Sequence, residues 1–469
     1  MADLLIKNAS ILTLDSVGRY YKHGAVAIEK DKIVALGDSA IVTKQHNAER
    51  VIEATDMAVL PGFVNLHTHL SEKFISGLSD DLDLYSWLSK LVYPVLLSST
   101  PEECYWMALL GCIEMIRSGI TCFVDTFGQL SEKRVLNRVA DAVLSSGIRG
   151  YVSREIEDVT EDSAELAMDD TLLTMRQLRS RGIDTVNVRL APGIVTTTSR
   201  ELLENVRDLA YREKLGVNMH LAETRREVLE SKRRFGETPV RHVHKVGLLG
   251  PNMIGAHCVW VDGKEIRLLR ETGTNVAYNP IANMKLADGV PPVWKMLNES
   301  VNVGLGTDGT ASNDNVDMFS CMKTGAYLQK VHCLNPALLS SQRMIQMATI
   351  NGAAALDADD ELGSIEVGKK ADLILIDLNV ANVSPVHDLA KQLVCSAGIE
   401  NVDTVIVNGN VVMEHHKILS ANEAEIFAKV KEIAEGLITR AKIRERLRGE
   451  LPGAFDLDRL SEQRANPHG

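Results

Sequence analysis

Eight short apolar runs, each followed by a segment with helical spacing, fill the middle of the chain. The runs are VLPGFVNLH, ITCFVD, IRGYVS, VNVRLAP, GVNMHLAE, MIGAHCV, TNVAYNP and VNVGLGTD. They are largely unalternated, as expected of strands that are covered on both faces. Eight strand-then-helix units in succession are typical of a (β/α)₈ barrel. The pattern therefore predicts an α/β fold with a TIM barrel over residues 59–362.

The helical spacing is clearest in residues 101–119, PEECYWMALLGCIEMIRSG, where Thr100 and Glu103 are spaced as a capping box. Residues 421–449 predict a further, charged amphipathic helix that packs on the outside of the molecule. The polar residues that follow need not be well ordered. Residues 421–469 are therefore expected to form a separate unit, a C-terminal helix and tail.

Short strand-like segments occupy both ends of the chain, over residues 1–58 and 363–420. GAVAIEKDKIVALG predicts a hairpin with Asp31 and Lys32 at the turn. Asn408 and Gly409, between VDTVIV and NVVM, mark a second hairpin. The two β pieces bracket the barrel, and we expect them to pair into one small β-sandwich domain built from both chain ends.

The composition narrows the choice of partners and compartment. The chain has 469 residues, 45% of them hydrophobic, and a net charge of −12, which argues against a nucleic-acid partner. No apolar run approaches a membrane span, and MADLLIKNASILTLD lacks the features of a signal peptide. The seven cysteines form no CxxC pair. We expect a cytoplasmic protein with reduced thiols and no membrane partner.

Residue types suited to metal binding or proton transfer stand at the ends of four runs. They are His67 and His69 in the first run, His220 and Glu223 in the fifth, His257 in the sixth and Asp308 in the eighth. His67 and His69 are two residues apart, so both would point to the same face of a strand. Since the carboxyl ends of barrel strands meet at one catalytic rim, the four runs predict a single site.

The residue types indicate the chemistry of that site. Three neutral imidazoles and a carboxylate suit one divalent transition metal, Zn²⁺ or alternatively Fe²⁺, with a position open for water. The expected ligands are His67, His69, His220 and Asp308. Glu223 is placed to carry a proton from the water to the substrate's ring nitrogen or leaving group. His257 would orient the attacking water, and Asp308 could also accept a proton from it.

Several motifs resemble the amidohydrolase superfamily, in the branch that holds the adenosine-type and S-adenosylhomocysteine deaminases and the s-triazine hydrolases. They are PGFVNLHTHL, HLAET, GAHCV, NPIANMKLADG and GLGTDGTASND, together with the terminal stretches GSIEVGKKADLILIDL and VDTVIVNGNVVMEHHKI. The resemblance covers essentially the whole chain. It implies one metal held by the four ligands named above, with Glu223 and His257 assisting catalysis.

The same resemblance bears on the number of metals. Two-metal relatives carry a carboxylated lysine at the end of the fourth strand. Here that strand ends RLAPG, residues 189–193, without a lysine. One metal is therefore expected, and ring opening of a cyclic amide is disfavoured.

The resemblance implies a hydrolase that deaminates an amino-substituted N-heteroaromatic ring, such as an aminopurine or aminotriazine. Three alternatives stay open. The first is dechlorination or dealkylamination of an s-triazine, and the second is deamination of S-adenosylhomocysteine or methylthioadenosine. The third is a non-catalytic scaffold that retains the barrel. Relatives also suggest a homo-oligomer, a dimer or larger.

Further residues are expected to contact the substrate: Tyr85, Trp87, Arg154, Asn279, Asn283 and Ser312. Tyr85 and Trp87 would supply a flat wall, although Trp87 also suits a helix core. Arg154 would be a rim cation, with a salt-bridged arginine as the equal alternative. Asn279, Asn283 and Ser312 stand in loops where capping and turn roles compete.

Two departures from the nucleoside-deaminase pattern affect the substrate. Gly193 stands where those enzymes typically have a histidine, and LDLYSW lacks the glutamate expected to bind a ribose. Both favour a free base or a triazine-like ring. The residues after Asp308, from Gly309 to Ser312, instead resemble the deaminase set. The sequence therefore predicts the reaction more closely than the ring.

Overall fold

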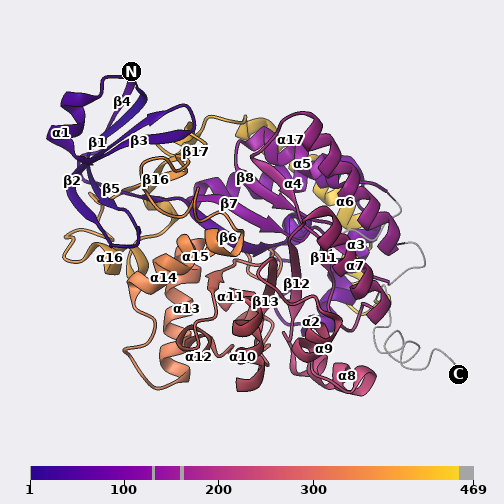
Figure 1. Ribbon diagram of the computed structural model, residues 1–469. Coiled ribbons are helices and arrows are strands. Elements are labelled where there is room, and N and C mark those ends of the chain that lie inside the picture. The colour runs from indigo at the N-terminus through magenta and orange to yellow at the C-terminus, as the bar shows by residue number, and fades with distance from the viewer. Residues whose placement is uncertain (1, 129–132, 159–162, 454–469) are drawn as a thin grey trace, which may run out of the picture.

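Nine strands from both ends of the chain form one sheet in the computed structural model, which describes residues 2–128, 133–158 and 163–453. In hydrogen-bonded order they are β19 (Lys417–Ile418), β18 (Asn410–Glu414), β17 (Val402–Val407), β16 (Leu373–Asp377), β5 (Met57–Pro61), β1 (Ala2–Leu12), β2 (Tyr20–Glu29) and β3 (Lys32–Asp38), while β4 (Ala48–Glu53) pairs with β1. Leu375 of β16 faces Val59 of β5 in antiparallel register. The two chain ends therefore pair, and Figure 1 shows the indigo N-terminal strands beside the golden β16 and β17.

Alternation along these strands separates two apolar clusters. Ile6, Ile28 and Leu373 belong to one buried cluster that spans both chain ends. Ala27 of β2 lies in a second cluster, with Val42 of α1 (Ser39–Gln45). This period-2 pattern is the expected result of a sheet with two covered faces.

One predicted hairpin is confirmed and the other is shifted by a residue. Asn408 and Gly409 join β17 to β18 with φ values of 51° and 78°. The turn between β2 and β3 consists of Lys30 and Asp31, because Glu29 pairs with Lys32, so the prediction of Asp31 and Lys32 was wrong by one position. Lys30 takes the left-handed conformation, φ 53°, that such a tight turn requires.

Each of the eight predicted apolar runs contains a strand. One parallel sheet holds β6 (Phe63–Thr68), β7 (Ile120–Asp125), β8 (Arg149–Val152) and β10 (Val186–Val188), and a second holds β12 (Val217–Leu221), β13 (Met253–His257), β14 (Asn275–Tyr278) and β15 (Val303–Leu305). A parallel bridge between Leu190 and Val217 links the sheets on one side. On the other, Asp308 N–H donates to the His67 carbonyl at 2.9 Å. A short pair, β9 (Glu155–Ile156) and β11 (Ala191–Pro192), extends beyond β8 and β10.

Helices follow most of these strands. They are α4 (Pro101–Arg117), α5 (Leu136–Ser146), α6 (Ser163–Ser180), α7 (Arg200–Glu213), α8 (Arg225–Phe235), α9 (Pro239–Val246), α10 (Gly263–Thr272), α11 (Pro280–Lys285), α12 (Val293–Asn298), α13 (Met318–His332), α14 (Ser341–Ala348), α15 (Ile350–Ala355) and α16 (Leu389–Cys395). The predicted capping box at Thr100 and Glu103 is confirmed at the start of α4. After β6 the chain forms a 3₁₀ turn (Leu70–Ile75), α2 (Leu84–Trp87), a π-helical turn (Leu88–Val92) and α3 (Tyr93–Ser98).

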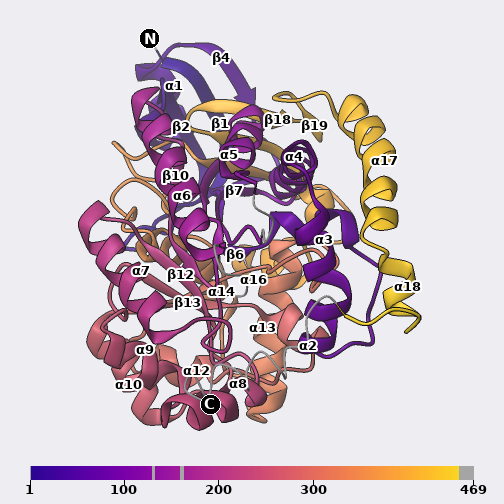
Figure 2. The ribbon, with the colours of Figure 1, turned by 90° about the vertical axis from the view of Figure 1, so that its right-hand side faces the viewer.

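The C-terminal segment forms two helices, α17 (Glu423–Arg440) and α18 (Ile443–Leu447), where one was predicted. Lys442 separates them in a left-handed conformation, φ 54°. They lie along the outside of the molecule (Figure 2), where Arg440 Nη2 contacts Glu103 Oε2 of α4 at 2.7 Å. The expected tail from residue 454 lies outside the described residues. Among the described helices, none combines the length and apolarity that a membrane crossing needs.

A buried ion pair joins the composite sheet to the strands of the middle region. Arg149 of β8 donates from Nε to Asp372 Oδ2 at 3.0 Å, and both side chains are buried. We expect Asp372→Ala to lower the free energy of unfolding by about 3–5 kcal/mol, because the guanidinium would remain buried without its carboxylate. Denaturant unfolding measures this change. The exposed pair of Arg200 and Glu204 is the control, and an equal loss in Glu204→Ala would contradict the expectation.

Candidate metal and catalytic site

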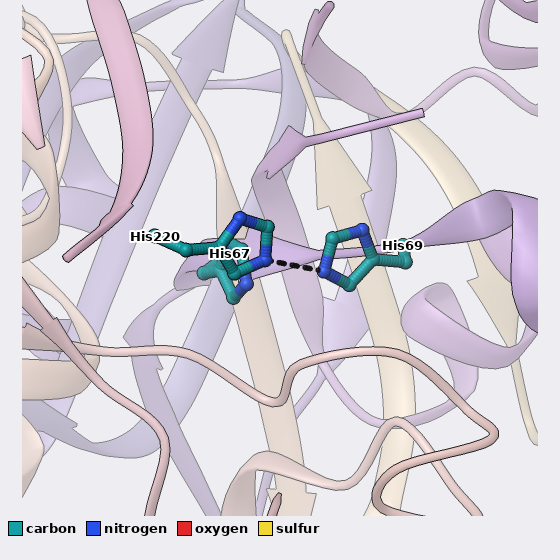
Figure 3. A group of neighbouring side chains, drawn as sticks. All are labelled: His67, His69 and His220. Carbon is teal, nitrogen blue, oxygen red and sulfur yellow. Dashed lines mark hydrogen bonds between the residues drawn. The ribbon is translucent and has the colours of Figure 1, made fainter. Parts of the chain in front are cut away.

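Three histidine side chains converge at the carboxyl ends of β6 and β12. His67 and His69 come from β6 and the residue after it, and His220 comes from β12 (Figure 3). His69 Nε2 lies 3.1 Å from His220 Nε2, and one ring nitrogen of each histidine lies within 4.8 Å of the others. His67 Nε2 is buried without a hydrogen-bond partner among the described residues. The structure therefore brings the three predicted histidine ligands together.

Asp308 completes this group. Its Oδ1 lies 3.3 Å from both His67 Nε2 and His69 Nε2. Burial alone would raise the pKa of Asp308, but the adjacent His67 and His69 imidazoles hold it well below its usual value. Asp308 takes a φ of 63°, and the Gly309 N–H donates to its Oδ1 at 2.8 Å. The sharp turn after β15 thus aims an ionised carboxylate at the histidines.

Neighbouring groups set the state of the imidazoles. Burial and the adjacent imidazoles hold the pKa of His220 well below its usual value, so this ring is neutral. His69 Nδ1 lies 2.6 Å from the Thr126 carbonyl oxygen, so Nδ1 carries a hydrogen and donates a hydrogen bond to it. That contact leaves His69 Nε2 facing the group, the arrangement usual for metal-binding histidines.

His257, at the end of β13, faces the same group. Its Nε2 lies 3.6 Å from Glu223 Oε1 and 3.9 Å from Asp308 Oδ2. Its Nδ1 lies 2.9 Å from Asn283 Nδ2 and 3.3 Å from Asn279 Nδ2. Since an amide nitrogen can only donate, Nδ1 accepts and Nε2 carries the proton. Burial lowers the pKa of His257 to about 3, so the ring is a neutral donor pointed into the site.

Glu223 follows β12 after Ala222, which has a φ of 52°. The Glu223 N–H donates to Glu227 Oε2 at 2.8 Å, so a carboxylate of α8 positions this turn. Burial raises the pKa of Glu223 well above its usual value, and nearby Asp288 adds to the effect. A carboxyl group in such surroundings can both hold and release a proton near neutral pH.

A narrow cavity of about 50 Å³ opens onto this group. Residues of the segment after β6 supply much of its apolar wall, among them Leu84, Trp87, Leu88, Val92, Tyr93 and Leu96. Of the six residues predicted to contact substrate, Trp87 and Ser312 line the cavity. Asn279 and Asn283 contact His257 instead, and this contact was not predicted.

Arg154 and Tyr85 are not among the described residues that line the cavity. Arg154 is fully buried and pairs with Asp170 at 3.1 Å, which corrects its prediction as a rim cation in favour of the salt-bridged alternative. The Tyr85 ring stacks under the Arg226 guanidinium, 3.9 Å from the ring centroid. Both side chains are therefore engaged elsewhere, and the predicted wall retains only Trp87.

Three cavity-lining carboxylates, Glu72, Glu155 and Glu157, were not predicted. Burial raises the pKa of Glu72 to about 8 and raises that of Glu155. The sequence contains a signal for two of these residues. Glu155 and Glu157 are two positions apart, shortly after the third apolar run. Residues two apart on a strand share a face, as His67 and His69 do.

Comparison with known proteins gives consistent matches over most of the chain. The amidohydrolase family model matches residues 58–412. The chain is 38% identical to a 5′-deoxyadenosine deaminase of Methanosarcina mazei over 94% of its length and 99% of that protein. It is also 38% identical to a 5-methylthioadenosine/S-adenosylhomocysteine deaminase of Pelotomaculum thermopropionicum, over 94% of this chain and 100% of that protein.

Two solved structures share the fold. A zinc-bound adenosine deaminase from Xanthomonas campestris superposes with a TM-score of 0.89 at 30% identity, covering 93% of this chain and 99% of that one. The atrazine chlorohydrolase of Arthrobacter aurescens superposes with a TM-score of 0.85 at 24% identity, covering 92% of this chain and 100% of that one. At that identity the second match shows the common fold alone.

Proposed function

This chain belongs to the amidohydrolase family, and we propose that it is a metal-dependent hydrolase that deaminates an amino-substituted N-heteroaromatic ring. The observation that carries the proposal is the convergence of three histidines, Asp308, Glu223 and His257 on one buried cavity. The deaminase names of its relatives support the same reaction class. The reaction replaces the exocyclic C–N bond with a C–O bond, and water supplies the oxygen as ammonia leaves.

We infer that His67, His69, His220 and Asp308 hold one divalent metal, Zn²⁺ in the first instance and Fe²⁺ as the alternative. Two imidazole nitrogens 3.1 Å apart and a third, His67 Nε2, 3.3 Å from the Asp308 carboxylate suit a shared cation. The zinc-bound relative supports zinc. When bound, the metal supplies Lewis acidity and a water of lowered pKa. Arg189, at the fourth strand, donates to the backbone carbonyls of Val217 and Asn252, which supports a single metal.

The remaining residues move and orient protons. Glu223, with its raised pKa, would take a proton from the attacking water, deliver it to the ring nitrogen, and later assist the departing amine. The His257 Nε2–H, 3.6 Å from Glu223 Oε1, would orient that water. Asn279 and Asn283 would position His257 by fixing which of its nitrogens carries the proton.

We also propose a complete (β/α)₈ barrel over residues 59–362 and a β-sandwich from residues 1–58 and 363–420, with 421–469 as a C-terminal unit. The Leu190–Val217 bridge and the Asp308–His67 hydrogen bond support barrel closure. The apolar cluster shared by both chain ends supports a sandwich. β5 pairs within the composite sheet, which favours a boundary near Gly62. A homo-oligomer and a cytoplasmic location stay predictions, the first testable by light scattering.

A substrate panel tests the proposed function. The metal-loaded protein would be incubated with 5′-deoxyadenosine, methylthioadenosine, S-adenosylhomocysteine, guanine, melamine and atrazine, and ammonia and chloride release would be measured. The relatives favour adenosine derivatives, whereas Gly193 in place of histidine favours a free base or triazine. Chloride release without ammonia would support the dechlorination alternative. No turnover of an extended panel of aminated rings would support the scaffold alternative.

Metal removal is a separate expectation. Dialysis against a chelator should reduce turnover to background, because the residues around the site have no other source of an activated water. Adding back Zn²⁺ or Fe²⁺ in parallel should restore activity and distinguish the two metals. Full turnover by protein shown to be metal-free by elemental analysis would contradict the expectation.

A further inference from the structure

Three glutamates, of which Glu72 and Glu157 are buried and Glu155 is half-buried, line the cavity without a part in the proposed hydrolysis. Glu72 lies in the 3₁₀ turn after β6, Glu155 belongs to β9, and Glu157 follows β9 directly. They reach the cavity from two separate parts of the chain. Glu72 and Glu157 are only 3% exposed, so neither is an ordinary surface carboxylate. Burying a carboxyl group is costly unless hydrogen bonds or an opposite charge compensate for the loss of water.

Glu157 occupies space that the chain leaves empty at Gly193. A Cβ atom at Gly193 would lie 2.4 Å from Glu157 Oε1 and 2.8 Å from Thr197 Oγ1. The Thr197 hydroxyl donates to the same Oε1. Gly193 is also the position where nucleoside deaminases resembling this chain typically carry a histidine. Here Gly193 has no side chain, and the Glu157 carboxyl group fills the space beside it.

Glu72 uses a second glycine in the same way. A Cβ atom at Gly309 would lie 1.8 Å from Glu72 Oε2. The Ala311 N–H donates to this oxygen at 3.3 Å. The turn that follows Asp308 therefore accommodates a second carboxylate beside the cavity. Each of two loops therefore contains a glycine that leaves room for a buried carboxyl group beside the cavity.

Carboxyl groups are the commonest ionisable groups around the cavity. Among its described lining residues there is no lysine or arginine. Five of its described lining residues carry carboxyl groups: Glu72, Glu155, Glu157, Glu223 and Asp308. On the apolar wall, Trp87 Nε1 is a buried donor without an acceptor among the described residues. The described lining thus offers carboxyl acceptors and, on the apolar wall, the Trp87 N–H, and it holds no lysine or arginine to pair with an anion.

We propose that this cavity selects an aminated ring bearing further N–H or O–H donors or a cationic substituent, and excludes substrates bearing carboxylate or phosphate groups. Glu155 and Glu157 would accept hydrogen bonds from those donors, and Trp87 Nε1 would donate to a ring acceptor. A carboxylate or phosphate group would be buried among carboxyl groups with no lysine or arginine to pair with it, which is costly. This inference rests on the proposed deaminase function and deepens it. The donors could be sugar hydroxyls or ring amines, since both present the same chemistry to a carboxylate.

Matched substrates test the proposal on the unaltered, metal-loaded enzyme. One series is melamine with one amine carrying an ethyl, 2-aminoethyl or carboxymethyl group. The other is 5′-thioadenosine with a methyl, 3-aminopropyl or 2-carboxyethyl group on sulfur. We expect kcat/KM of the ammonium member to exceed that of the carboxylate member at least tenfold, mostly through KM. Equal or better turnover of the carboxylate member would overturn the proposal and leave deamination intact, whereas no turnover in either series would count against the proposed function.

Two further pairs of substrates show whether the hydrogen-bond donors that the cavity recognises are sugar hydroxyls or ring amines. If they are sugar hydroxyls, 2′,3′-dideoxy-5′-methylthioadenosine should lose at least tenfold in kcat/KM against methylthioadenosine. If they are ring amines, the loss should instead appear when melamine amines remote from the leaving group are replaced by methyl groups. A loss in either pair supports the proposal. Unchanged kcat/KM in both pairs would overturn it.

Two variants test whether Glu157 is responsible for the expected preference for ammonium over carboxylate substrates. Glu157→Gln should reduce the ammonium-to-carboxylate ratio of kcat/KM at least tenfold, with a smaller change for the neutral member. Gly193→Ala should act in the same direction, because its Cβ would displace the Glu157 carboxylate. Glu432→Gln, on the exposed side of α17, should leave the ratio unchanged. A ratio unaltered in folded Glu157→Gln and Gly193→Ala proteins would contradict this assignment.

Discussion

Glu223→Gln should retain its metal and lose turnover by about 10²–10⁴-fold, the range expected when a general acid–base is removed. Glutamine preserves the shape of the side chain but cannot carry the proton between water and ring. The Glu223 N–H to Glu227 hydrogen bond is a backbone contact and should survive the substitution. Single-turnover kinetics and elemental analysis on the same preparation would separate loss of chemistry from loss of metal.

The exposed Glu271 of α10 is the matched control for this substitution. Glu271→Gln should keep full turnover and full metal content. The pH profile provides a second readout, because burial raises the pKa of Glu223 well above its usual value. Removal of the Glu223 carboxyl group should flatten the part of the pH dependence of kcat/KM that follows its titration. Normal turnover in Glu223→Gln would show that another residue carries the proton.

His69→Ala should bind zinc more weakly by more than about 100-fold, since even residues that only orient metal ligands contribute 10–100-fold to affinity. The substitution removes the nitrogen that lies 3.1 Å from His220 Nε2 and 3.3 Å from Asp308 Oδ1. Competition with a chromophoric chelator measures the affinity directly, without reference to activity. Turnover should fall in proportion to the metal that is lost.

His415 serves as the control for the histidine substitution, because it is exposed and lies far along the chain in the β18–β19 turn. His415→Ala should bind zinc as the unaltered protein does. Circular dichroism would verify that both variants are folded. Full zinc affinity in folded His69→Ala protein would show that the ligand set proposed for this site is wrong.

The eight strands and the convergence of the site residues could be predicted because both depend on local pattern. Unalternated apolar runs predict buried parallel strands, and each of the eight runs contains one. A parallel arrangement then brings the carboxyl ends of β6, β12, β13 and β15 to one edge. This is why His67, His220, His257 and Asp308 meet although they are far apart in the chain.

The roles of individual polar residues could not be read in the same way. Arg154 at a strand end suited a rim cation equally well, and only the packing of α6 placed Asp170 3.1 Å from it. Asn279 precedes α11 and Asn283 lies within it, and nothing in the local sequence shows that His257 Nδ1 lies 2.9 Å from Asn283 Nδ2. Contacts of this kind depend on which loops pack together, which short-range periodicity does not encode.

By itself, the sequence determined the order and type of the elements and the chemistry at the strand ends, because hydrophobic spacing and residue type act locally. The tertiary structure decided which acceptors share the cavity. Glu157 and Glu72 lie there because Gly193 and Gly309, on other strands' loops, leave room for their oxygens. Such space is created when distant segments pack, so only the folded chain reveals it.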